Sequence, residues 1–89
     1  MDEQTFRDTA ARDGYAEPVI VEWDADTFND SHTHDFAARI FVLAGEMTVV
    51  CEDGDTRTCR TGDSNELAAE VRHSERIGPD GVRFLVARK

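Results

Sequence analysis

Basic residues are scarce in this 89-residue chain, which carries ten lysines and arginines against nineteen aspartates and glutamates, a net charge of -9. Nucleic acids and anionic membranes bind proteins through lysine and arginine side chains that displace counterions, so this balance argues against both as partners. A chain of this length buries only about 60% of the surface that its unfolded form exposes. We therefore expect one small domain whose thin core is stabilised by a partner subunit or a metal ion.

Long hydrophobic runs are also missing, and cysteines are few. No stretch approaches the roughly 18 apolar residues of a membrane span, and the N-terminus lacks the basic head and apolar run of a signal peptide. The two cysteines, Cys51 and Cys59, flank the hairpin signal Asp53-Gly54. A two-residue turn there would place Cys51 opposite Thr56, which is out of register for a disulfide with Cys59. We therefore predict two buried free thiols and a cytoplasmic protein.

Short runs of strand-forming residues separated by turns make up most of the chain. We expect seven strands, at 19–23, 38–43, 46–51, 56–60, 64–68, 71–77 and 82–87, and all of these runs except 64–68 contain β-branched or aromatic residues. Residues 24–30 are polar and predict a loop, and the helical spacing of apolar residues before Gly14 predicts a short helix, or an arm that packs on a partner subunit. The pattern predicts an all-β sandwich or barrel over residues 18–89, preceded by a helix or arm over 1–17.

All three histidines of the chain stand at informative positions. His32 and His34 form a His-Thr-His sequence before the run at 38–43, and residues two apart on an extended backbone point to the same face. His73 lies about forty positions later, on another short strand that a barrel can bring against the pair. Three neutral imidazoles that converge on one point can bind Zn, Fe, Ni, Mn or Cu as a divalent ion.

The spacing of these residues resembles the two motifs of the cupin superfamily. His32 and His34 match the histidine pair of the first motif, and Gly45 matches the glycine that ends it. Gly62 matches the glycine that opens the second motif, and His73 stands at the offset of its histidine. The resemblance covers roughly residues 23–86 and implies a small jelly-roll barrel, the double-stranded β-helix.

Five positions depart from the cupin pattern. Asp26 replaces the opening glycine of the first motif, and Ala38 replaces its metal-binding glutamate. Ala68 and Glu70 replace the proline and glycine of the second motif, and Ile77 replaces its asparagine. One of the four ligands that the resemblance implies is therefore absent from its usual position.

Three interpretations of the site follow. The three histidines can bind a metal by themselves and leave open positions for water or substrate. Glu75 can complete the site, because it lies two residues beyond His73 and shares its face on an extended strand, although a solvated surface acid is the ordinary expectation for such a residue. Alternatively, the site binds no metal and the histidines only line a pocket.

Other side chains are assigned by alternation along the predicted strands. Asn65 and Leu67 are expected to point inward, where Asn65 can hydrogen-bond a ligand or satisfy backbone groups. Arg39 is expected on the opposite face from Ala38, in a surface salt bridge or an interface. Seven apolar side chains are expected to form the core and barrel walls rather than a binding box: Trp23, Phe36, Ile40, Phe41, Met47, Val49 and Phe84.

The sequence contains no arrangement of a Ser-His-Asp triad, no glycine-rich phosphate loop and no cysteine nucleophile. The cupin resemblance implies a wide range of functions, from dioxygenases and isomerases to sensors. We expect a homodimeric, metal-binding cupin domain that takes a small anionic or oxygenated ligand, because three neutral histidines leave a bound metal positive. The alternative is a metal-free barrel with a ligand-binding, sensory or structural role and no turnover. The sequence does not decide between an enzyme and a binding protein without turnover.

Overall fold

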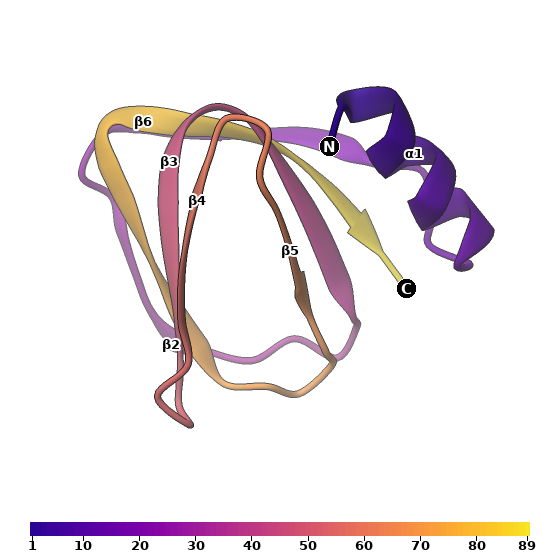
Figure 1. Ribbon diagram of the computed structural model, residues 1–89. Helices are drawn as coiled ribbons and strands as arrows, with labels where there is room; N and C mark the ends of the chain where they lie inside the picture. Colours follow the sequence, from indigo (N-terminus) through magenta and orange to yellow (C-terminus); the bar gives the residue numbers. More distant parts are fainter.

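Two long antiparallel strands, β3 (Ala38–Cys51) and β6 (His73–Arg88), form the centre of the fold in the computed structural model, which describes residues 1–89 (Figure 1). Four short strands pair along their outer sides: β1 (Val19–Trp23), β2 (Phe28–His32), β4 (Thr56–Arg60) and β5 (Ser64–Leu67). β1 and β2 extend the two halves of β6, while β5 and β4 extend the two halves of β3. The sheet therefore folds into two halves, β1-β6-β3-β5 and β2-β6-β3-β4, which confirms the predicted jelly-roll barrel.

Both long strands bend where the sequence predicts turns. Gly45 and Gly81 have φ angles of +84° and +75°, and a Cβ built on Gly45 would lie 2.0 Å from the Gly81 carbonyl oxygen. The β3–β6 pairing shifts register on either side of Ala44 but continues beyond it. The prediction of separate strands at 38–43 and 46–51, and at 71–77 and 82–87, is therefore wrong. Glycines with positive φ let each strand turn a corner without leaving the sheet.

β2 lies in the segment that the sequence analysis assigned to a polar loop. Its residues, Phe28 to His32, pair with β6, and Asn29 stands opposite Glu75. The prediction failed because this edge strand lacks an apolar alternation: Phe28 is 55% exposed and the three residues after it are polar. Backbone hydrogen bonds to β6, rather than burial of its side chains, hold β2 in the sheet.

A short helix, α1 (Glu3–Arg12), covers the outer face of the barrel near the C-terminus (Figure 1). Asp2 caps it by accepting a hydrogen bond from the Thr5 amide at 2.8 Å, as expected for an N-terminal aspartate. Phe6 and Ala10 are fully buried, and the Phe6 ring lies 5.5 Å from that of Phe41. The predicted helix is thus present and packs on its own barrel. It does not have the length and apolar character needed to cross a bilayer.

The core has two layers, one on each side of the sheet. Outside, Phe41, Leu85 and Ala87 pack under α1. Inside the barrel lie eight buried side chains: Val42, Met47, Val49, Cys59, Ile77, Val82, Phe84 and Val86. Of the seven apolar side chains predicted as core, Phe41, Met47, Val49 and Phe84 are buried, but Phe41 packs against the helix outside the barrel.

The two cysteines are free, as predicted. Cys59 is buried inside the barrel, whereas Cys51 is only half-buried. The predicted strand register is off by one residue, because Cys59 stands opposite Met47 rather than Thr48. The loop after Cys51 is longer than a two-residue turn: the Cys51 amide donates to the Asp55 carbonyl at 2.8 Å.

Two residues other than glycine have positive φ angles, Asp26 (+58°) and Glu70 (+66°). Both stand where the cupin motifs have glycine, so the backbone keeps the turn although the residue suited to it is gone. A side chain in this left-handed region crowds its own backbone, at a cost of roughly 1–2 kcal/mol.

Glu70→Gly is therefore expected to stabilise the protein by about 0.5–1 kcal/mol, measured by urea denaturation. The matched control is Glu17→Gly, since Glu17 is exposed and its φ is not positive. The control should be neutral or destabilising. Equal effects at the two positions would contradict the interpretation of Glu70 as strained.

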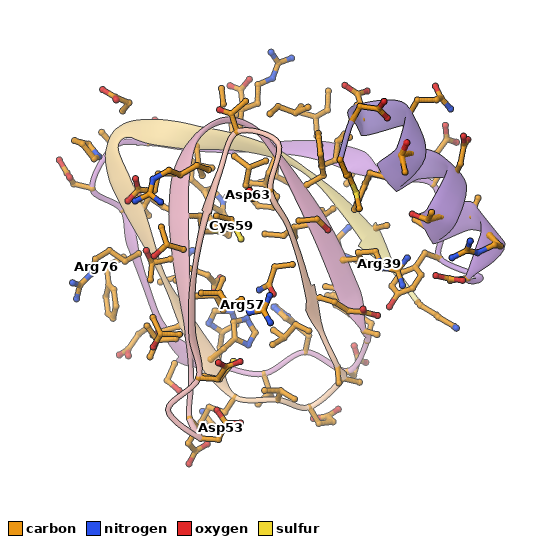
Figure 2. All side chains as sticks on the ribbon, in the orientation of Figure 1. Arg39, Asp53, Arg57, Cys59, Asp63 and Arg76 are labelled. Atoms are coloured by element: carbon orange, nitrogen blue, oxygen red, sulfur yellow. The ribbon has the colours of Figure 1, made fainter.

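Arg39 joins the end of α1 to the barrel (Figure 2). Its guanidinium lies 3.0 Å from the Asp13 carboxylate and 3.2 Å from that of Glu66, and it stacks 4.4 Å from the centre of the Tyr15 ring. The Tyr15 hydroxyl donates to the same Glu66 oxygen at 2.9 Å. Arg39 is thus on the outer face and in salt bridges, as predicted from alternation.

Hydrogen bonds in this cluster lower the pKa of both carboxyl groups. Those from Arg12 and then Arg39 lower the pKa of Asp13, and those from Tyr15 and then Arg39 lower the pKa of Glu66. A lowered pKa in the folded state contributes stability that is present above the ordinary carboxyl range and is lost as pH falls through the shifted values.

We expect the free energy of unfolding to fall as pH drops below about 4.5, and to fall less steeply in Arg39→Gln, because this variant removes the shared partner of both carboxylates. The control is Arg83→Gln, which removes an exposed pair with Glu22 and should keep the acid slope of the wild type. Denaturant unfolding at a series of pH values measures this slope. An unchanged slope in Arg39→Gln would refute the assignment.

Candidate metal centre

The barrel contains a cavity of about 720 Å³ that is open to solvent. Most of its wall is apolar, with the aromatic rings of Trp23, Phe36 and Phe84 among the contributors. Asn65 and Leu67 both line it, so they point inward as predicted. The polar part of the wall comprises three histidines and a few carboxylate, amide and guanidinium groups.

His32, His34 and His73 lie together on this wall. The ring centres of His32 and His73 are 4.4 Å apart, and that of His34 lies 4.9 Å and 5.2 Å from them. One nitrogen from each ring can be chosen so that all lie within 4.8 Å of one another. The end of β2 and the start of β6 bring them together, because His32 stands opposite His73 in that pair of strands.

Backbone carbonyls fix the orientation of two of these rings. His32 Nδ1 lies 2.6 Å from the Asp30 carbonyl oxygen, and His73 Nδ1 lies 2.9 Å from that of Val71. A carbonyl oxygen only accepts, so each Nδ1 carries the hydrogen. In the neutral ring, Nε2 then presents a lone pair to the cavity, as in histidines that bind metal ions.

Glu75 belongs to the same cluster. It is only 5% exposed, and its Oε2 lies 3.3 Å from His32 Nε2 and 3.4 Å from His73 Nε2. The expectation of a solvated surface acid is therefore wrong, whereas the alternation argument that placed Glu75 on the face of His73 is confirmed. Position on a strand determined its side of the sheet, and there it is buried in the cavity wall against His32 of β2.

The Glu75 oxygen has no hydrogen-bond partner, although it is buried. Burial raises the pKa of Glu75, and the neighbouring His32 and His73 act in the opposite direction. Burial also lowers the pKa of His34, with further contributions from His32 and His73. Lone pairs of nitrogen and oxygen thus converge in a poorly hydrated place, an arrangement that a cation stabilises.

Two distances in this cluster match those between the ligands of a metal ion, whereas the three histidine nitrogens are spread over up to 4.8 Å and would have to move closer to bind one ion. Ligands about 2.0–2.1 Å from a tetrahedral ion lie about 3.3–3.4 Å from each other, which matches the distances from Glu75 to the two histidines. Cys51 and Cys59 stay outside the set, and burial raises the pKa of both thiols. The groups that face one another here are therefore imidazole and carboxylate, a donor set that would suit Zn, Fe, Mn, Ni or Cu.

Sequence reasoning missed three polar residues of the cavity wall, Asn29, Asp30 and Arg88. The first two belong to the strand that the sequence did not reveal. Arg88 has a signal in the sequence: it stands two residues beyond Val86, whose side chain lies inside the barrel, so alternation directs it to the same face.

In metal-free protein, Glu75→Gln is expected to raise the free energy of unfolding by about 1–3 kcal/mol, because it removes a buried charge and supplies an N–H donor to the imidazole lone pairs. Chelator-treated samples are compared by urea denaturation. Glu46→Gln, at an exposed pair with Arg60, is the control and should change stability by less than about 1 kcal/mol. A clear loss of stability in Glu75→Gln would contradict this account of the Glu75 oxygen.

No protein-family model and no curated protein sequence matches the chain. Several solved structures do match. The DMSP lyase DddQ from Ruegeria pomeroyi has a TM-score of 0.74 and 23% identity over 82% of this chain and 37% of its own. An RmlC-like cupin from Shewanella frigidimarina has a TM-score of 0.67 and 22% identity, over 81% of this chain and 64% of its own.

A putative ethanolamine utilization protein Q from Salmonella typhimurium has a TM-score of 0.66 and 28% identity, over 81% of this chain and 55% of its own. The chain thus spans between 37% and 64% of the length of these three proteins. Together with the pairing of its strands, these similarities identify the fold of the chain as that of a small cupin.

Proposed function

We propose that this cupin binds a divalent metal ion through His32, His34 and His73, with Glu75 as a further ligand, and that a small anionic or oxygenated molecule binds beside the ion. The observation that carries the proposal is the buried Glu75 oxygen, which lacks a hydrogen bond and faces two imidazole lone pairs. A lone carboxylate in such a place is costly, and a cation removes that cost.

A bound divalent ion would supply Lewis acidity to an oxygen atom of the ligand. The chain's own groups prepare this site. The carbonyls of Asp30 and Val71 hold two imidazoles with Nε2 toward the cavity, and the Phe36 ring stacks 4.8 Å from the ring of His34. The apolar wall keeps water away from the ligand, and Asn65 offers it a hydrogen-bonding amide.

Metal-free ligand binding is the second candidate, and Ala38 is the observation that favours it. Ala38 stands where the cupin pattern has a metal-binding glutamate, so the usual donor set is incomplete. In this alternative the histidines and Glu75 hydrogen-bond a ligand directly, and the barrel has a sensory or structural role. The two candidates differ in the metal content of the purified protein.

The homodimer predicted from the sequence is part of the proposal. β1 is an edge strand, paired only with β6, and its Val19 and Ile20 are 47% and 52% exposed. An unpaired edge with apolar side chains is a surface that a second copy can extend.

The two free cysteines support the proposed cytoplasmic location, where thiols stay reduced.

Protein purified without chelator is expected to retain about one equivalent of a first-row divalent metal, measured by elemental analysis. His32→Ala and His73→Ala should lose most of it. Glu75→Gln should weaken affinity roughly 10- to 100-fold in a chelator competition titration, because it removes one donor and keeps the others.

The matched control is Glu46→Gln, which removes a carboxylate from the outside of β3 and should leave metal affinity unchanged. Wild-type protein that stays metal-free even after incubation with these ions would refute the metal proposal and favour the second candidate. Equal retention in wild type and both histidine variants would place the metal elsewhere.

A further inference from the structure

We infer that Ala38 and Arg88 form an anion subsite, in which Arg88 binds a carboxylate of the ligand in the space that the glutamate of the cupin motif would occupy. This inference deepens the proposed function, because it names the chemical class of the ligand. It rests on the proposed metal only for the contact between a second oxygen atom of the ligand and the metal ion. The carboxylate contact itself depends on the barrel alone.

The β3–β6 pairing sets Ala38 directly opposite Arg88. The next residues along, Ala37 and Lys89, exchange two backbone hydrogen bonds of 3.0 Å and 2.9 Å. Ala38 and Arg88 are therefore a non-hydrogen-bonded pair, the kind in which facing side chains come closest, with Cβ atoms about 4.5–5.5 Å apart. Both side chains line the cavity.

Arg88 is the one arginine or lysine that lines the cavity, and it forms no ion pair although the chain has nineteen acidic residues. Two carboxylates, Asp30 and Glu75, also line the cavity, but neither lies within ion-pair distance of Arg88. Its charge is thus free to meet a carboxylate that comes from outside the chain.

The Phe36 ring supports the guanidinium. Arg88 Cζ lies 5.3 Å from the centre of this ring, which lies 4.8 Å from the centre of the His34 ring. A guanidinium over an aromatic face keeps its N–H edges available for a bidentate contact with a carboxylate. The two distances also place the guanidinium no more than about 10 Å from the His34 ring.

This separation limits the size of the ligand. A ligand that contacts both Arg88 and the histidine cluster therefore needs only a few carbon atoms between its two polar ends. The ligand class is therefore a short organic acid with a carboxylate for Arg88 and a second oxygen donor for the histidine cluster. Its carbon chain would contact the apolar wall.

Ala38 is what leaves the subsite open. A glutamate at this position would face Arg88 across the ladder and provide the carboxylate from within the chain. The alanine methyl group leaves that volume to the ligand. Two other arginines without ion pairs do not compete, since neither Arg57 nor Arg76 lines the cavity; Arg76 points away from the barrel in Figure 2.

The test measures binding of dicarboxylates with two to five carbon atoms by calorimetry, with the corresponding neutral diamides as matched probes. At least one acid should bind wild-type protein, its diamide much more weakly, and Arg88→Gln should weaken binding of the acid by at least about tenfold. Arg76→Gln, the control, makes the same charge change on the outside of β6 and should bind as the wild type does. Ala38→Glu should block the subsite and weaken binding as much as Arg88→Gln.

The subsite is refuted if no acid binds the wild type, if diamides bind as tightly as acids, or if Arg88→Gln and Arg76→Gln behave alike. Arg88 is exposed at the end of β6, so its variant is decisive even if Ala38→Glu misfolds. Metal content, measured on the same samples, should be equal in wild type and Arg88→Gln. Wild-type protein that binds no metal even after incubation with divalent ions, but binds the acid in an Arg88-dependent way, would refute the metal proposal and retain the subsite.

Discussion

The pairing of β3 with β6 is the constraint on which the rest of the molecule depends. One end of this ladder sets Cys51 opposite His73, where the histidine cluster lies, and the other end sets Ala38 opposite Arg88. Between them, Gly45 and Gly81 approach so closely that no side chain fits at Gly45, and both strands turn there. A single ladder thus bends into two sheet halves and places a candidate metal centre and a candidate anion subsite in one cavity.

The cavity concentrates groups that would be unfavourable in an ordinary protein interior. Glu75 contributes a buried oxygen without a hydrogen bond, in a barrel whose interior core has only eight buried side chains. Small domains have little stability in reserve, so a buried oxygen without a hydrogen bond is a substantial cost for this chain. The cavity also differs in charge from the rest of the molecule. The chain has a net charge of -9, yet the cavity wall carries an arginine without an acidic partner.

Alternation along strands predicted much of the site from sequence. It correctly directed Asn65 inward and Arg39 outward, and it gave Glu75 and His73 a common face. It could not reveal that Glu75 is buried, because the neighbouring strand β2, whose His32 contacts Glu75, is polar and is held by backbone hydrogen bonds that leave no apolar pattern. The continuous course of β3 was also hidden, since a glycine at a bend and a glycine in a turn look alike in a sequence.

X-ray absorption spectroscopy of the zinc-loaded protein tests the central claim most directly, because it reports the atoms around the ion rather than its retention. The account predicts multiple scattering from three imidazole rings and nitrogen or oxygen neighbours at about 2.0–2.1 Å, with one fewer light-atom neighbour from the protein in Glu75→Gln. A spectrum without imidazole scattering, or with sulfur neighbours at about 2.3 Å, would contradict it.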